Sequence, residues 1–139
     1  MKAKHFVNWD TAKALRAAGY NEDIDHCINE DGDIMEVFVL NQDLPEWKCQ
    51  CPSIQEALDW LEERDIRIEV RMKHMKIKGD PYKVADDDEY QWQYFYDICK
   101  GDDVENPIVA CDESDCVIMY TDRNLCWQDA IAKGVSVLI

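Results

Sequence analysis

The clearest pattern in the chain is a helix followed directly by a strand. Four apolar residues recur at helical spacing and predict one buried helical face: Ile54, Ala57, Leu58 and Leu61. Ser53 and Glu56 have the spacing of a capping box, in which each side chain accepts a hydrogen bond from the other residue's backbone N–H. The pattern therefore predicts a helix over 53–64 that begins at Ser53.

After position 64 the apolar period changes from helical spacing to strict alternation. Apolar residues at 66, 68, 70 and 72 alternate with charged ones, which is typical of a half-buried strand. At His74 the alternation shifts by one residue, because Met75 and Ile77 become the apolar positions. Such a shift turns the buried face over unless a bulge absorbs it. We therefore expect a bulge or a strand end at 73–74, followed by a solvated loop over 78–89.

The N-terminal part predicts a short helix. Asp10 is a suitable N-cap for a helix over 11–18, and Gly19 stands where a C′ glycine would end it. Leu15 and Ala18 are its inward candidates. A helix this short depends on tertiary contacts for its stability.

Two apolar stretches on either side of Asp31-Gly32 predict a hairpin. The first, 24–28, alternates with polar residues, and the dipeptide is a strong turn signal. The second, 35–40, is apolar on both faces. That composition indicates a strand in the centre of its sheet.

The C-terminal third predicts an aromatic strand, a short hairpin or single strand, and a helix. One side of the strand at 90–100 carries five large residues: Tyr90, Trp92, Tyr94, Tyr96 and Ile98. The stretches 108–111 and 116–120 form either a last hairpin or one strand after a loop. Asp122 caps the final helix, whose apolar stripe contains Gly134 and so allows a neighbour to approach closely.

These elements predict one α+β domain over 1–139. Two or three helices pack on one face of a mainly antiparallel sheet, because that layering buries every apolar stripe with short connections. At 139 residues the chain can bury a core without a metal or a disulfide.

The net charge of the chain argues against two kinds of binding partner. Thirty acidic residues against fifteen basic ones give −15. Direct binding to nucleic acid or to anionic membranes is not expected, because both depend mainly on lysine and arginine contacts. We find no apolar run long enough to span a membrane and no signal peptide, so a cytoplasmic protein is expected.

Seven cysteines give one candidate metal site. Cys49, Cys51, Cys111 and Cys116 could supply four thiolates to zinc, but neither pair has the spacing that is usual in structural zinc sites. The count is odd, so we expect reduced cysteines that are buried as small hydrophobic residues. No cofactor is predicted.

Other chemistry is less well supported. An EF-hand alignment on Gly32 places Cys27 and Phe38 at ligand positions, so it fails. A loose nuclease pattern at 46–48 lies in a turn and lacks a basic surface. The acidic clusters at 86–89 and 112–115 are interpreted as solvated loops. No nucleophile motif accompanies the three histidines.

Three segments together resemble small uncharacterised proteins of gut-bacterial genomes and their prophages. They are CPSIQEALDWL at 51–61, WQYFYD at 92–97 and WQDAI at 127–131. The resemblance implies an accessory role on a mobile element and assigns no activity or catalytic residue.

Three functions are compatible with the sequence. The favoured one is a non-enzymatic protein-interaction module, with Tyr90, Trp92, Tyr94 and Tyr96 as candidate partner-binding residues. The second is an acidic mimic of nucleic acid that occupies a DNA-binding protein, and the third is a metal-dependent enzyme. The sequence does not predict an oligomeric state.

Overall fold

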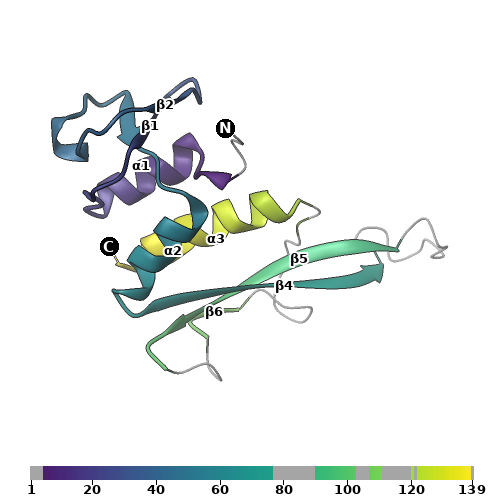
Figure 1. Ribbon diagram of the computed structural model, residues 1–139. Coiled ribbons are helices and arrows are strands. Elements are labelled where there is room, and N and C mark those ends of the chain that lie inside the picture. The colour runs from purple at the N-terminus through teal and green to yellow at the C-terminus, as the bar shows by residue number, and fades with distance from the viewer. Residues whose placement is uncertain (1–4, 77–89, 103–106, 111–119, 121, 139) are drawn as a thin grey trace.

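The computed structural model describes residues 5–76, 90–102, 107–110, 120 and 122–138. Within these residues the predicted α+β class is confirmed: three α-helices accompany two three-stranded antiparallel sheets (Figure 1). The elements are α1 (Trp9–Ala17), β1 (His26–Asn29), β2 (Ile34–Glu36), a 3-10 helix (Asn41–Asp43), β3 (Lys48–Gln50), α2 (Ile54–Glu62), β4 (Ile66–Lys76), β5 (Tyr90–Lys100), β6 (Val109–Ala110) and α3 (Arg123–Leu138).

The helices lie between the two sheets. The smaller sheet has the order β2-β1-β3 and the larger one the order β4-β5-β6. Helix α1 packs on β1 and β3, while α3 packs on β4, β5 and both other helices. Figure 1 shows this order from the small sheet at the top to the large sheet at the bottom. No helix of the described part is long and apolar enough to cross a membrane.

One cluster of buried side chains joins all three helices to both sheets. Its fully buried members include Leu15 of α1, Leu61 of α2, Ile98 of β5 and Ile131 of α3. Burial of apolar surface is the main stabilising term in folding. The cluster therefore fixes the large sheet to the rest of the molecule.

Helix α1 begins earlier than the sequence predicts. Asn8, and not Asp10, is its N-cap: the Asn8 side chain accepts a hydrogen bond of 2.9 Å from the Thr11 backbone N–H. Asp10 lies in the first turn. At the other end the glycine prediction is confirmed, since Gly19 has a φ of +98° and the backbone N–H of Tyr20 bonds the Leu15 carbonyl in a Schellman pattern.

The apolar stretch 35–40 is not a central strand, so that prediction is wrong. Strand β2 ends at Glu36 and is the edge of its sheet, and Phe38 is 60% exposed. The turn at Gly32 does connect β1 with β2. Farther on, the Asn41 side chain bonds the Tyr20 carbonyl at 2.6 Å and the Gln50 backbone N–H at 2.7 Å. These bonds tie the 3-10 helix to the segment after α1 and to β3.

The capped helix and the strand after it are confirmed. Ser53 and Glu56 form both bonds of the capping box, and α2 covers Ile54–Glu62. Asp65 then has a φ of 63°, a left-handed conformation that aspartate adopts more readily than most residues. Its carbonyl accepts a bond of 2.8 Å from the Gly101 N–H. This turn places β4 next to β5 from its first residue.

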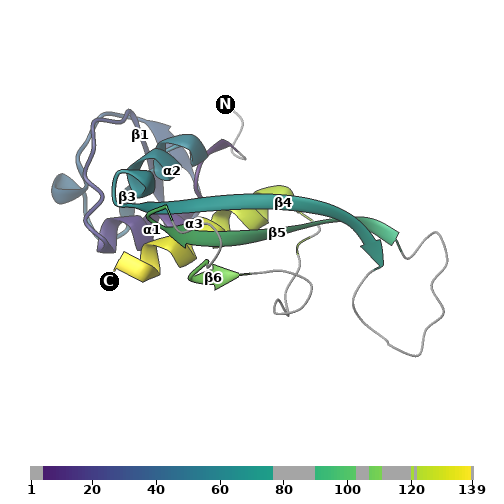
Figure 2. The ribbon, with the colours of Figure 1, turned by 90° about the horizontal axis from the view of Figure 1, so that it is seen from below.

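The predicted bulge or strand end at 73–74 is absent. Strand β4 pairs with β5 without interruption from Ile66 opposite Lys100 to Lys76 opposite Tyr90. The shift in the apolar pattern falls where the strands extend beyond the helices (Figure 2). No helix of the described residues covers the sheet there. The predicted loop at 78–89 and the acidic clusters at 86–89 and 112–115 lie outside the described residues.

Helix α3 begins as predicted. The Asp122 carboxylate accepts bonds from the backbone N–H groups of Asn124 and Leu125. Gly134 faces β4, and a Cβ at this position would lie 3.2 Å from Ile68 Cδ1. The close approach inferred from the glycine is therefore confirmed. Of the predicted strands 108–111 and 116–120, the structure describes β6 and a bridge between Tyr120 and Tyr94.

Candidate functional site

Strands β4 and β5 form a two-stranded ribbon that is anchored to the body at one end and projects from it at the other (Figure 2). At the anchored end Ile66 and Ile98 are buried against the core. At the projecting end Met72 is 57% exposed and Trp92 is 55% exposed. Met72 lies directly opposite Tyr94, and Trp92 is two residues along β5 on the same face.

The structure divides the predicted aromatic row into two parts. Tyr96 is half-buried, packs against the core and lies 6.2 Å from the ring of Tyr120. Burial raises the pKa of Tyr96, as does the nearby Asp129 carboxylate. Tyr94 is half-buried and Trp92 exposed. The side chain of Tyr90 is outside the described part, so its candidate role is still a prediction.

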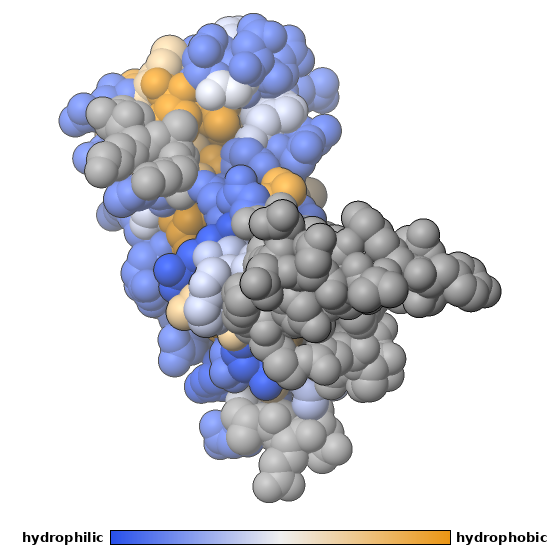
Figure 3. Space-filling model, turned by 90° about the vertical axis from the view of Figure 1, so that its right-hand side faces the viewer, coloured by the Kyte–Doolittle hydropathy of each residue, from blue (hydrophilic) through white to orange (hydrophobic). Residues whose placement is uncertain are grey.

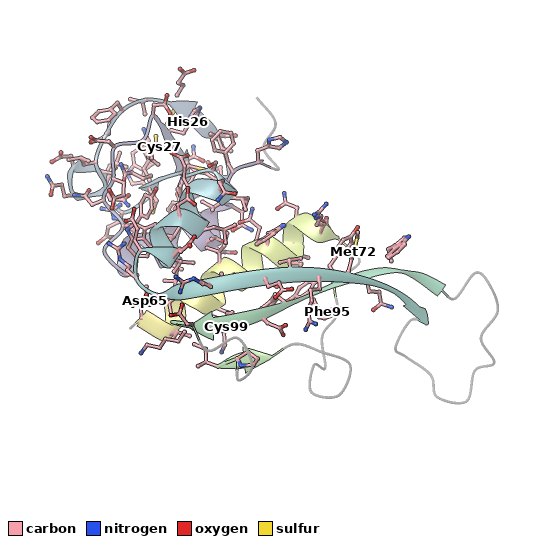
Figure 4. All side chains as sticks on the ribbon, turned by 60° about the horizontal axis from the view of Figure 1, so that its bottom comes forward. His26, Cys27, Asp65, Met72, Phe95 and Cys99 are labelled. Carbon is pink, nitrogen blue, oxygen red and sulfur yellow. The ribbon has the colours of Figure 1, made fainter. Side chains whose placement is uncertain are left out.

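The opposite face of β5 is the more deeply buried one. Its residues are Gln93, Phe95, Asp97 and Cys99, each less than a tenth exposed. Arg71 of β4 forms an ion pair with Asp97, and its guanidinium lies 4.8 Å from the centre of the Phe95 ring. Figure 4 shows Met72 and Phe95 on opposite sides of the ribbon. Phe95 is the one aromatic residue among the polar residues at alternate positions on this side of β5, and it is the signal in the sequence that could have predicted the burial of this face.

The five cysteines that the structure describes are all buried: Cys27, Cys49, Cys51, Cys99 and Cys126. Figure 4 places Cys27 in the small sheet and Cys99 in the large one, with the helices between. Burial raises the pKa of Cys51 to about 12, and burial together with Asp129 raises that of Cys126 to about 12. Both thiols are therefore protonated and weakly nucleophilic at neutral pH.

Two of the four candidate zinc ligands are buried, Cys49 within β3 and Cys51 just after it. Cys111 and Cys116 lie outside the described residues, so the four-thiol site stays a prediction. Among the residues that are described, no group of three or more His, Cys, Asp or Glu side chains is placed to hold a metal ion.

A cleft of about 880 Å³ lies between α1 and the segment before β3. Trp9 and Trp47 line it, but the ammonium group of a lysine of the same chain lies over each of the two indole rings. Lys13 Nζ lies 5.8 Å from the ring centre of Trp9, and Lys48 Nζ lies 4.7 Å from that of Trp47. Lys13 and Lys48 thus already make the cation–π contacts that a cationic ligand would make with these rings.

Arg16, at the back of the same cleft, has a structural role. Its guanidinium donates hydrogen bonds of 2.6, 2.8 and 2.5 Å to the carbonyls of Leu44, Pro45 and Lys48. Bonds from a charged donor are stronger than neutral ones. Arg16 therefore joins α1 to the turn before β3, and three of its five N–H donors are used within the chain.

Two buried glutamines fix loops, and neither was predicted from the sequence. Gln128 of α3 accepts a bond from the Asn8 N–H and donates one to the Phe6 carbonyl, each at 2.8 Å. Gln50 of β3 bonds both the N–H and the carbonyl of Glu22. Nothing in their spacing distinguishes them from surface glutamines, because their partners are distant backbone groups.

A hollow of about 460 Å³ lies on the face shown in Figure 3. Apolar side chains gather in the upper half of that view, and the lining of the hollow includes Phe6, Ile28, Ile34 and Leu125. Leu125 is 49% exposed. The hollow contains no converging set of catalytic groups among its lining residues.

Comparisons with known proteins gave no relative. No protein-family model matches the chain, and neither a curated protein nor a solved structure was found to match it.

Proposed function

We propose that this protein is a non-enzymatic interaction module that binds another protein through the β4–β5 ribbon. The observation that supports this is the exposure of Met72 and Trp92 at the end of the ribbon that projects from the body. Tryptophan, tyrosine, methionine and arginine are enriched in protein interfaces. Tyr94, opposite Met72, continues the same apolar face towards the core.

The anchoring of the ribbon supports the same proposal. A binding surface costs less to use when it is held in its bound conformation beforehand. Here Ile98 and Ile66 fix the near end in the core, and unbroken pairing extends that order to Lys76. The exposed side chains are thus presented on a regular sheet. A role as an accessory protein of a prophage or another mobile element is part of the proposal, and the three sequence segments described above support it.

The test is affinity capture with two matched double variants. The first, Met72→Glu with Trp92→Glu, changes the ribbon. The control, Val37→Glu with Phe38→Glu, places the same charges on exposed apolar residues of the segment after β2. Both variants should retain the far-UV circular dichroism of the wild type.

We expect one stoichiometric partner that binds the wild type and the control and is lost from the ribbon variant. Equal capture by both variants would remove the ribbon from the proposal, and the lack of any stoichiometric partner would remove the function. A captured DNA-binding protein that is released by added salt from both variants alike would favour the nucleic-acid mimic instead.

A further inference from the structure

The outer edge of β4 is long and regular. Strand β4 is the outermost strand of the order β4-β5-β6, and in the part of the chain that the structure describes no strand pairs with its outer side. In an antiparallel pair every second residue directs its backbone N–H and C=O away from the partner. Eleven residues at an edge therefore present a row of backbone donors and acceptors to an incoming strand.

Several usual protections of an edge strand are missing from β4. Proteins shield such edges with bulges, prolines or very short strands. Strand β4 has no proline, its register has no bulge, and it is about twice as long as a typical strand. Its charged residues, such as Glu69 and Arg71, are the remaining protection.

Charge distinguishes the ribbon from the rest of the protein. Strands β4 and β5 together contain five basic residues and two acidic ones, whereas the whole chain carries −15. An acidic strand would therefore meet local positive charge at β4. At physiological salt the Debye length is about 8 Å, so the acidic body acts only weakly on a segment bound at the projecting end.

A groove continues the edge towards the body. Its volume is about 300 Å³, and Leu58 and Glu62 of α2 line one side, with Ile66, Arg67 and Ile68 of β4 on the other. Leu58 and Ile68 are half-buried. An added strand that runs along β4 would bring its apolar side chains to the face of Ile68 and its charged ones to the face of Arg67.

We infer that the outer edge of β4 accepts an extended acidic segment of another protein as a fourth strand of the large sheet. This inference rests on the proposed function and names the chemistry of its partner: carboxylates alternating with apolar side chains. Main-chain hydrogen bonds supply the affinity in this binding mode, and the alternating side chains supply the specificity.

Two other occupants fit less well. Pairing of β4 with β4 of a second copy would bring two basic strands together, and like charges on adjacent strands are destabilising. Nucleic acid has no peptide N–H and C=O groups, so it cannot continue the ladder of main-chain hydrogen bonds at the edge.

The test uses a capped ten-residue peptide of alternating glutamate and valine with the full-length protein. Two further probes carry backbone N-methyl groups, one at all glutamates and one at all valines. In a strand only one of these sets of N–H groups faces β4. Hydrogen exchange of β4 amides is measured with and without peptide. Lys73→Glu is the test variant, and Lys13→Glu, on the exposed side of α1, is the control with the same charge change.

We expect the unmodified peptide to bind and to slow exchange at alternate amides of β4. One methylated probe should lose binding and the other should keep it. Lys73→Glu should weaken binding roughly fivefold, while Lys13→Glu should have less effect. Equal binding of both methylated probes would overturn the inference, because it would mean that charge alone holds the peptide. The inference would also be overturned if the peptide left hydrogen exchange in β4 unchanged, or if a single-stranded oligonucleotide bound more tightly than the peptide. A third contradicting result is slower exchange in β4 that depends on protein concentration alone and not on the peptide.

Failure of this inference is distinct from failure of the proposed function. If capture depends on Met72 and Trp92 but the peptide leaves β4 exchange unchanged, the partner binds the aromatic face and not the edge. If the peptide protects β4 but no stoichiometric partner is captured, the edge can accept a strand and the proposed function is wrong.

Discussion

Gly134 allows a quantitative test of how α3 holds the ribbon. A Cβ at this position would lie 3.2 Å from Ile68 Cδ1, 3.4 Å from Ile66 Cγ2 and 3.4 Å from Leu61 Cδ1. The last two distances are close to ordinary carbon contacts, and the first is shorter than the optimum of about 3.5–4.0 Å. Cδ1 is the far end of the Ile68 side chain, which is only half-buried and can move by a few tenths of an ångström.

These distances determine opposite results for two substitutions. Gly134→Ala gains about 1 kcal/mol from helix propensity and loses part of it to the displacement of Ile68, so we expect it to stabilise the fold by about 0.5 kcal/mol. Gly134→Leu forces three more carbons between the same side chains. Overpacking of this kind costs about 1–3 kcal/mol, and we expect a net loss of about 2 kcal/mol.

The assay is urea unfolding followed by far-UV circular dichroism, with the slope of the transition checked for each variant. Lys133→Leu, one residue away on the exposed side of α3, is the control and should change the free energy of unfolding by less than about 0.5 kcal/mol. A Gly134→Leu variant as stable as the wild type would show that α3 does not press on β4 here. A decrease of more than about 1 kcal/mol in the free energy of unfolding of Gly134→Ala would show that the Ile68 side chain cannot move aside.

Asn8→Ala should destabilise the protein by about 1 kcal/mol in urea unfolding and Asp10→Ala by less than half of that, because Asn8 is the cap; the reverse order would contradict the observed start of α1. Arg16→Ala should cost about 2 kcal/mol through the loss of three bonds to carbonyls, and an unchanged urea midpoint would count against it. Cys51 and Cys126 have pKa values raised to about 12, whereas a thiol in the unfolded chain titrates near about 8.5. Their contribution to the free energy of unfolding is therefore complete below about pH 8.5 and declines as the pH rises towards about 12. Urea midpoints that stay constant from about pH 8 to about pH 10.5 would refute this.

Helix ends were predictable where both cap partners are close in sequence. Ser53 and Glu56 are three residues apart, and Asp122 bonds the N–H groups of Asn124 and Leu125, so the signal and the structure share one short segment. At α1 two candidate caps, Asn8 and Asp10, stand two residues apart. The tertiary bond from the Asn8 N–H to Gln128 favours the earlier one, and no local pattern contains that information.

Strand positions were less predictable than strand existence. The apolar stretch 35–40 has the composition of a central strand, yet β2 ends at Glu36 at an edge of its sheet, and tertiary bonds from Asn41 to Tyr20 and Gln50 hold the 3-10 helix that follows. The candidate site was likewise predicted only in part. Trp92 is exposed and Tyr96 packs on the core although both belong to one alternation, since α3 covers only the anchored end of the ribbon.

The sequence by itself determined the helices, the long strands and the α+β class, because caps and apolar periods act over a few residues. Only the tertiary structure decided which face of each strand is buried, which strand lies at an edge, and where the ribbon leaves the body. Alternation defines two faces without saying which one meets a neighbour, and an edge exists only once distant segments have paired. The exposed end at Met72 and the open side of β4 are therefore properties of the assembled fold.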